Sequence, residues 1–312
     1  MVPPALLPNV HSNVPNFFGH RKVCQGAYMG GILAKLQNEL GEQFVDYDFI
    51  LFEAEHGDPE YLRHYDYAAR KTVVFYLGDE AATVPHELMR TPVYAVFKHY
   101  LPGPHNGYAR LLPLPLGYLS STPHYEVMPS MARPNNVFFS GAIHYTRLPL
   151  LQHFTGYDWM PFRFWNAVYH RFFKEHVAYQ YDAHFPASII RFNRQGFKSG
   201  FTPELFGRLL YECKIALCPV GVVNPETYRH FEALRAGCVV VSGPLPPQYF
   251  YMNSPIISLP DWHSLDTTIT QLLADPAALA LRQQAGLAWW EKVCSETAVA
   301  RHLAAELHRL AA

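Results

Sequence analysis

The sequence predicts an α/β protein made of two halves. Short apolar runs rich in β-branched and aromatic residues alternate with helical patterns in the first half, as is typical of buried parallel strands. A proline-rich stretch then interrupts the chain, and a strand, loop, helix and strand follow one another over 214–242. With 312 residues, each half is long enough to bury its own core.

The composition narrows the protein class. Hydrophobic residues make up 49% of the chain and charged residues 16%, which excludes a disordered or coiled-coil protein. The net charge of -1 provides no overall attraction for nucleic acid, so we expect no nucleic-acid partner and only a local anion site. The five scattered cysteines indicate reduced thiols. We see no secretory signal or membrane-length apolar run, and predict a cytoplasmic protein, with peripheral membrane association left open.

The first half contains one clear helix and a series of strands. Helical periodicity runs over 25–40 and ends at Gly41. The apolar runs that predict buried strands are 49–52, 72–77 and 92–97. The run over 111–117 carries two prolines, which predict an edge or extended segment. We place the domain boundary in the Pro- and Ser-rich stretch 120–136.

The second half opens with a strand over 136–141 and a helix from about Tyr145. Thr202 and Pro203 have the residue types of a helix cap and first turn, so a helix should run to about Glu212. The elements predicted after it are a strand over 214–219, a loop over 220–224, a helix over 225–236 capped by Asn224, a strand over 238–242, and two closing helices, one entered through Asp275-Pro276 and one over 296–310.

The entrance of the helix predicted over 225–236 carries the chemistry. Its free backbone N–H groups form an anion site, to which Thr227 and Arg229 add a hydroxyl and a guanidinium that suit a diphosphate. Glu232 lies one turn further on the same face and could accept bonds from the vicinal hydroxyls of a ribose. The alternative is a solvated ladder of ion pairs formed by Glu226, Arg229 and Glu232. The position just after a buried strand and a Pro/Gly loop favours the binding site.

The stretch from Tyr211 to Pro247 combines a strand end, a helix entrance and a second strand, with Cys218, Pro219, Gly221, Glu226, Arg229, Glu232, Ala233, Gly237 and Val241 at characteristic positions. In these residues it resembles the donor-binding signature of exostosin-like glycosyltransferases with the GT-B fold, and especially the ribitol xylosyltransferase branch. The resemblance implies two Rossmann-like domains that face each other across a cleft. These are an acceptor-binding domain over 1–125 and a nucleotide-sugar-binding domain over 131–290, with a final helix over 291–312 that returns to the first domain.

The resemblance also implies a function in polysaccharide biosynthesis. It implies a hexosyl- or pentosyltransferase that moves a sugar from a UDP-sugar to a glycan, polyol-phosphate or lipid-linked acceptor, with inversion and with neither metal nor cofactor. The spacing between Glu226 and Glu232 is shorter than that of the two carboxylates in many GT-B enzymes, which leaves the role of Glu226 open.

A second glycine turn, 138–147, is similar to the opening of the donor domain in the same enzymes. Gly141 would let the backbone approach a ligand, and Arg147 could contact phosphate. The densest basic cluster is formed by Arg191, Arg194 and Lys198, one of which could reach the diphosphate. The residues assigned to the nucleotide-sugar site are therefore Gly141, Arg147, Lys198, Gly221, Asn224, Glu226, Thr227, Tyr228, Arg229 and Glu232.

The acceptor half should supply the base that inverting transfer requires. Asp79 is our first candidate and Glu80 the second, because both follow a predicted strand. The alternative candidates, Glu53, Glu55 and His56, follow another strand, and each of these residues could instead cap a helix.

Two competing functions remain open at this point. Asp46 and Asp48 form an Asp-x-Asp triplet, by which metal-dependent GT-A glycosyltransferases hold Mn²⁺ or Mg²⁺. The triplet precedes the first strong strand with no second metal cluster nearby, so we interpret it as a turn entering that strand. The other alternative is a nucleotide-sugar-binding protein without turnover.

Overall fold

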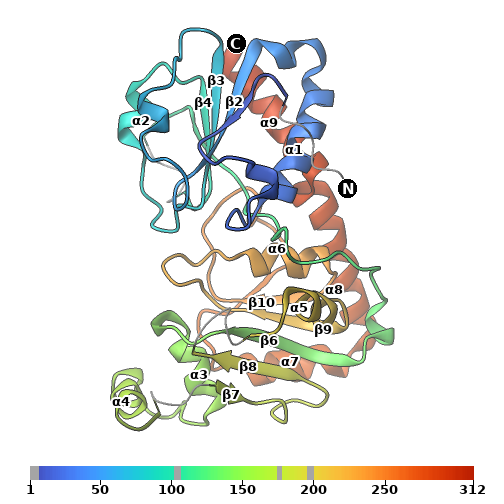
Figure 1. Ribbon diagram of the computed structural model, residues 1–312. Coiled ribbons are helices and arrows are strands. Elements are labelled where there is room, and N and C mark those ends of the chain that lie inside the picture. The colour runs from blue at the N-terminus through green and yellow to red at the C-terminus, as the bar shows by residue number, and fades with distance from the viewer. Residues whose placement is uncertain (1–6, 102–106, 174–177, 195–199) are drawn as a thin grey trace. The chain divides into compact units, whose positions relative to one another are not determined.

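The structure is a computed structural model that describes residues 7–101, 107–173, 178–194 and 200–312. Its contacts divide the chain into two units (Figure 1). Unit 1 comprises residues 1–120, 246–252 and 291–312, and unit 2 comprises residues 121–245 and 253–290. Both units are α/β bodies built on mainly parallel sheets, which confirms the predicted α/β class and fits the predicted GT-B fold with two Rossmann-like domains.

Unit 1 contains a parallel sheet of five strands in its described residues, in the order β1-β2-β3-β4-β5. The strands are β1 (Val10–Ser12), β2 (Tyr47–Glu53), β3 (Lys71–Leu77), β4 (Ala95–Lys98) and β5 (Leu111–Pro113). β2 is buried along its whole length, and the apolar run 49–52, which predicted a buried strand, forms its centre. β5 lies at the edge, where a strand containing proline is tolerated because one side needs no ladder partner.

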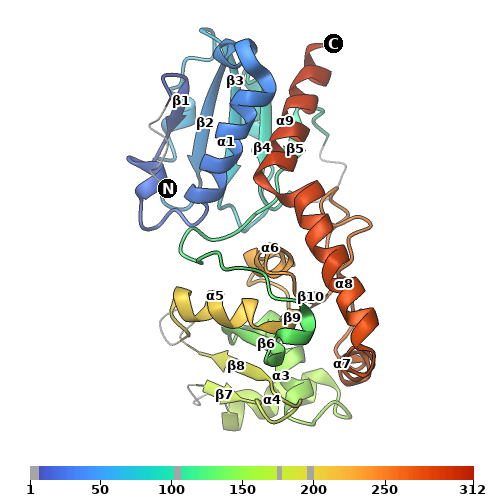
Figure 2. The same cartoon turned by 90° about the vertical axis from the view of Figure 1, so that its right-hand side faces the viewer.

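Two long helices cover unit 1, and they are α1 (Gly26–Leu40) and α9 (Glu296–Ala311), which lie side by side in Figure 2. The hydroxyl of Tyr28 donates to the carbonyl of Cys294 at 2.5 Å, and that of Tyr94 donates to the carbonyl of Leu307 at 3.0 Å. These bonds fix the C-terminal segment on unit 1. The short helix α2 (His86–Arg90) adds Leu88 to a core with the side chains of β2, β3 and β4.

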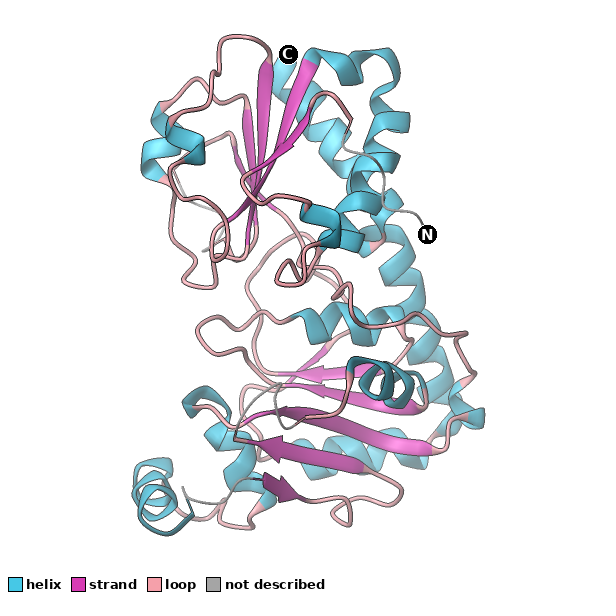
Figure 3. Cartoon of the chain, in the orientation of Figure 1, coloured by secondary structure: helices cyan, strands magenta, loops and turns pink. Residues whose placement is uncertain are grey.

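Unit 2 contains a sheet of six strands in its described residues, in the order β11-β10-β9-β6-β8-β7. The strands are β6 (Asn135–Ala142), β7 (Ala178–Gln180), β8 (Ile189–Asn193), β9 (Cys213–Cys218), β10 (Val239–Ser242) and β11 (Ile257–Ser258). Figure 3 shows the strands of both units in magenta. β7 pairs antiparallel with β8, and the other neighbours are parallel. The strand, helix and strand predicted over 214–242 is confirmed.

The helices of unit 2 are α3 (Leu148–Phe154), α4 (Phe162–Val168), α5 (Pro203–Tyr211), α6 (Tyr228–Arg235), α7 (Leu265–Ala274) and α8 (Pro276–Trp289). α3 and α7 share a core with β6, β8, β9 and β10. The predicted cap of α5 is confirmed, because the Thr202 side chain accepts a bond from the Leu205 amide. α7 was not predicted, since nothing at its start resembles a strong cap and its N-cap residue Ser264 makes no side-chain bond.

The start of α6 corrects a prediction. The sequence predicts a helix over 225–236 capped by Asn224, but α6 begins at Tyr228 and its N-cap is Thr227. The side chain of His230 completes a capping box with Thr227, which places the helix start three residues later. Asn224 and Glu226 therefore belong to the loop before the helix.

The described helices include none that is long and apolar enough to cross a membrane.

Candidate functional site

The candidate site of unit 2 lies where β6 and β9 end side by side. From β6 the chain continues toward β8 and β7, whereas from β9 it continues toward β10 and β11. The connections that follow β6 and β9 therefore leave the same edge in opposite directions. Ligands of open parallel sheets bind at the carboxyl ends of the strands at such a switch point.

Polar bonds join the loops that follow β6 and β9. The Thr146 hydroxyl donates to the carbonyl of Gly221 at 2.7 Å, and Nε of Arg147 donates to the carbonyl of Val220 at 2.9 Å. Another guanidinium nitrogen of Arg147 donates to the carbonyl of Ala142 at 3.1 Å. The Arg147 side chain is buried, so it positions both loops from inside.

Two glycines give this edge its shape. A Cβ on Gly221 would lie 2.6 Å from the carbonyl oxygen of Asn224, so the loop after β9 closes too tightly for any side chain. A Cβ on Gly141 would lie 3.1 Å from one guanidinium nitrogen of Arg147 and 3.1 Å from one of Arg229. Gly141 thus leaves room for two guanidinium groups to converge on the end of β6.

Arg229 reaches this point from the first turn of α6. Its Nη2 donates to the carbonyl of Ser140 at 2.7 Å, and its guanidinium lies 5.3 Å from the ring centre of Phe139, a cation–π distance. Its buried Nε has no hydrogen-bond partner among the described residues. Burial lowers the pKa of Arg229, while Cys218 and Glu232 act in the opposite direction.

Glu232 lies one turn further along α6 and is buried. Its Oε1 accepts a bond from the Thr122 hydroxyl at 2.8 Å, which fixes one side of the carboxylate. A carboxylate has about four lone-pair sites, so it can accept further bonds from a ligand. Glu226 is also buried, in the loop before α6.

Sequence reasoning did not identify His230. It is fully buried, its Nδ1 contacts the Thr227 backbone, and its Nε2 lies 2.8 Å from the Ser242 hydroxyl on β10. Burial first, and then the positive charges of Arg229 and Arg147, lower its pKa to about 4. The ring is therefore neutral near pH 7 and links α6 to the end of β10. Its place three residues after Thr227 was the available signal, because the N3 position completes a capping box.

In the part of the chain that the structure describes, the basic cluster predicted before α5 adds no free cation to this site. Lys198 lies outside the described residues. Arg191 forms an ion pair with Asp182 and donates two further bonds to its carboxylate. A phosphate would have to compete with that carboxylate for Arg191.

Unit 1 presents a different set of groups where β2, β3 and β4 end. Asp79, just after β3, forms an ion pair with Nζ of Lys98 at 2.8 Å and accepts a hydrogen bond from the Thr83 hydroxyl at 2.6 Å. Burial acts to raise the pKa of Asp79, but the bonds from Lys98 and Thr83 outweigh it and the pKa is lowered. Lys98 is fully buried, so this ion pair is internal. Glu80, the second candidate base, is partly buried beside it.

Glu53, the last residue of β2, differs from Asp79 in that its pKa is raised rather than lowered. It is 3% exposed, and burial raises its pKa despite a bond of 2.7 Å that it accepts from Gln25 Nε2. A Cβ on Gly78 would lie 2.1 Å from Glu53 Oε1, so the loop after β3 lies directly against this carboxylate. Gly78 also has a φ of +77°, which glycine adopts without strain.

His99 follows Lys98 at the end of β4 and is fully buried. Burial first, and then the charge of Lys98, lower its pKa to about 3. A backbone hydrogen bond at Pro115 acts to raise the pKa of His99 but does not outweigh these two causes. The end of β4 thus carries a charged lysine and a neutral histidine next to each other.

Side chains of unit 1 form hydrogen bonds with the Asp-x-Asp triplet. Asp48 accepts a bond from Arg70 at 3.0 Å and another from the Tyr65 hydroxyl at 3.1 Å. Asp46 ends the 3₁₀ turn that precedes β2, as the interpretation of the triplet as a turn predicts. A metal ion at this place would have to displace the guanidinium of Arg70.

No protein-family model matches the chain, and no curated protein matches it in sequence. Solved structures that resemble it include AviGT4, a glycosyltransferase involved in avilamycin A biosynthesis, with 14% identity over 97% of both chains and a TM-score of 0.48. Sucrose-phosphate synthase from Thermosynechococcus elongatus has 12% identity over 95% of this chain and 79% of its own, with a TM-score of 0.47. TarM has 8% identity over 88% of this chain and 58% of its own, with a TM-score of 0.42. Because these TM-scores are below 0.5, the function is inferred below from the chain's own residues.

Proposed function

We propose that this protein is a glycosyltransferase that moves a sugar from a nucleotide-sugar, of which a UDP-sugar is the first candidate, to a hydroxyl of a glycan or polyol acceptor. The observation that carries the proposal is the convergence of Arg147 and Arg229 on Gly141, at the end of β6 and beside the start of α6. Glu232 lies one turn further along the same helix.

Two guanidinium groups this close repel each other, and the surrounding burial increases the cost of their charge. A diphosphate would relieve that repulsion. Guanidinium groups match phosphate oxygens with paired N–H bonds, and the N-terminus of α6 adds backbone donors and a favourable dipole. The buried Nε of Arg229 is a further donor at this place.

Glu232 supplies the second half of the recognition. A buried carboxylate one helical turn from a diphosphate site can accept two hydrogen bonds from the vicinal hydroxyls of a ribose. Thr122 holds the carboxylate by one oxygen, which reduces the entropy lost when a ligand binds. The pair of arginines and this glutamate therefore suit a nucleoside diphosphate better than an isolated phosphate.

Transfer also requires stabilisation of the departing diphosphate and removal of a proton from the acceptor. Arg147, Arg229 and the α6 dipole would stabilise the leaving group, and such electrostatic groups can contribute about 3–4 kcal/mol each. For the base we propose Glu53, because its raised pKa makes it a stronger base than Asp79, whose pKa is lowered by Lys98. Asp79 and Glu80, predicted from sequence, stay predictions.

The test is UDP binding measured by titration calorimetry. Arg229→Ala should weaken binding about 10- to 100-fold, because a hydrogen bond to a charged group contributes about 1.5–3 kcal/mol. Arg208→Ala, which removes an exposed arginine of α5, is the control and should change the affinity less than twofold.

Two outcomes would contradict the proposal. Unchanged affinity in Arg229→Ala would remove Arg229 from the phosphate site, and absence of binding to UDP and to a panel of UDP-sugars would remove the nucleotide-sugar assignment. Binding without hydrolysis or transfer would favour the protein without turnover. Transfer that stops in EDTA would favour the metal-dependent alternative.

A further inference from the structure

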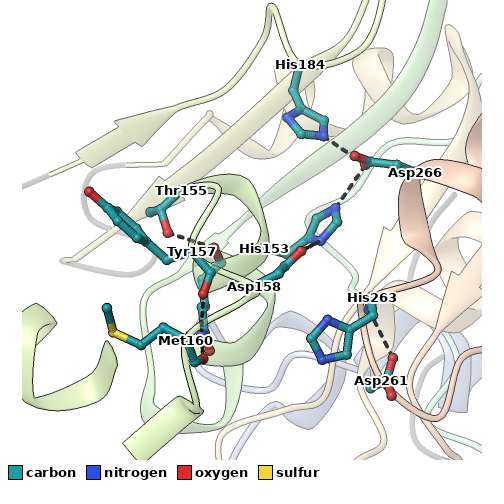
Figure 4. A network of polar contacts seen from close by, with 10 residues as sticks. His153, Thr155, Tyr157, Asp158, Met160, His184, Asp261, His263 and Asp266 are labelled. Carbon is teal, nitrogen blue, oxygen red and sulfur yellow. Dashed lines mark hydrogen bonds and ion pairs between the residues drawn. The ribbon is translucent and has the colours of Figure 1, made fainter. Parts of the chain in front are cut away.

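A cluster of polar side chains unrelated to the proposed transfer site lies elsewhere in unit 2. His153 belongs to the last turn of α3, His184 to the turn between β7 and β8, and Asp266 to the first turn of α7. Figure 4 shows both imidazole rings directed at the same carboxylate. Nε2 of His153 lies 2.9 Å from Oδ1 of Asp266, and Nε2 of His184 lies 2.8 Å from the same oxygen.

We propose that His153, His184 and Asp266 bind a divalent transition metal, with Zn²⁺ as the first candidate. Two imidazoles and one carboxylate suit Zn²⁺ and its neighbours in the first transition row. One ligand atom from each residue lies within 4.8 Å of the others. Donor atoms around a tetrahedral zinc lie roughly 3.4 Å apart, because each bond is about 2.0–2.1 Å long, so small side-chain rotations would complete the set.

Asp158 gives the cluster a feature typical of metal sites. Its Oδ2 lies 2.5 Å from Nδ1 of His153, on the side of the ring opposite Asp266 (Figure 4). Metal-binding histidines usually donate their second N–H to a carboxylate in this way, which fixes the ring and directs the other nitrogen at the metal. A cation would lie between Nε2 of His153 and Oδ1 of Asp266, in place of their direct contact.

The burial of the cluster suits a ligand that enters from solvent. The side chain of His153 is 4% exposed, that of His184 25% and that of Asp266 52%. His153 packs beside the ring of Phe154, and the centres of the Phe154 and His184 rings lie 4.9 Å apart. Water would occupy the remaining coordination positions on the open side. The metal would tie α3, the β7–β8 turn and α7 to one another.

The test uses the full chain without an affinity tag, titrated with ZnCl₂ in a buffer that does not chelate metals. One equivalent should bind, and saturation should raise the Tm by roughly 5 °C or more. His184→Gln and Asp266→Asn should each weaken binding about 100-fold or more, and Asp158→Asn, which changes only the support of His153, by about 10- to 100-fold. His263→Gln removes an exposed neighbouring histidine and should change the affinity less than twofold.

Substitution with Co²⁺ gives a second readout that does not depend on the variants folding. Visible d–d absorption with nitrogen and oxygen ligands should appear with the original chain and vanish in EDTA. The proposal is overturned if the original chain shows neither saturable Zn²⁺ binding nor a Co²⁺ spectrum. It is also overturned if His184→Gln, folded as judged by its metal-free melting curve, binds zinc like His263→Gln.

Discussion

The two units end their sheets with opposite chemistry. At the edge of unit 2, Arg147 and Arg229 converge on Gly141, and Glu232 follows Arg229 one turn further along α6. At the edge of unit 1, Glu53 has a raised pKa beside the loop that carries the Asp79–Lys98 ion pair. The carboxyl ends of parallel strands thus carry converging cations in one unit and buried or partly buried carboxylates in the other. Side chains at the strand ends, rather than the fold, decide this difference.

The largest effect we expect comes from Glu53. If it is the base, Glu53→Gln should lower kcat by about 10²- to 10⁴-fold, the range for loss of a general base, with little change in UDP affinity. Glu55→Gln tests the exposed alternative two residues away and should leave kcat within about twofold. Equal losses in both variants, measured in a transfer assay, would show that unit 1 does not place its base at the end of β2.

The next effect concerns stability. Asp79→Asn removes a carboxylate that forms an ion pair with the fully buried Lys98, which should reduce the free energy of unfolding by about 3–5 kcal/mol. Glu87→Gln removes an exposed partner of Arg63 and should cost less than about 1 kcal/mol. Urea denaturation measures both. If Asp79→Asn were as stable as the control but inactive, Asp79 would be a base after all.

The third effect depends on pH and should appear in both units. The pKa values of His99 and His230 are lowered to about 3 and about 4, whereas both should be near 6.5 in the unfolded chain. The unfolded chain therefore binds more protons below pH 6.5, so the free energy of unfolding falls as the pH falls from 6.5 toward these values.

The expected loss for His230 is about 3 kcal/mol, because each pKa unit corresponds to about 1.4 kcal/mol. Melting curves recorded from about pH 7 down to about pH 4.5 measure the trend, and His230→Gln should make it shallower. NMR titration of the ring protons provides the control. A ring that titrates near its ordinary pKa would show that it is not held neutral by burial.

The smallest effects distinguish the glycines of the two edges. Gly78→Ala places a side chain at a φ of +77°, which costs about 1–2 kcal/mol, and its Cβ would lie 2.1 Å from Glu53 Oε1. In Gly141→Ala the added Cβ would lie 3.0–3.1 Å from the end of the Phe139 ring and from the guanidinium groups of Arg147 and Arg229, so it should cost about 1 kcal/mol and weaken UDP binding a few-fold. A larger stability loss in Gly141→Ala would reverse the comparison.

Sequence reasoning succeeded where the signal was local. The cap at Thr202, the helix entered through Asp275-Pro276 and the apolar runs of β2 and β3 are decided by residues close together in the chain, and the structure confirms them. The predicted start of α6 was wrong because Pro225 is also compatible with a loop. Thr227 caps the helix instead, and its capping box requires the side chain of His230. The position of Arg229 and Glu232 on one helix face followed from their spacing alone.

The sequence by itself determined the α/β class, the order of most strands and helices, and the segment that carries the arginine and glutamate of the proposed donor site. Only the tertiary structure decided that the guanidinium groups of Arg147 and Arg229 lie close together. It also decided that Asp79 forms an ion pair with Lys98 while the pKa of Glu53 is raised. The cluster of His153, His184 and Asp266 likewise could not be foreseen from the sequence. Periodicity and capping are set by neighbours along the chain. Burial and ion pairing depend on residues brought together from distant segments. Burial and ion pairing also shift the pKa values of the site residues, and so their charges.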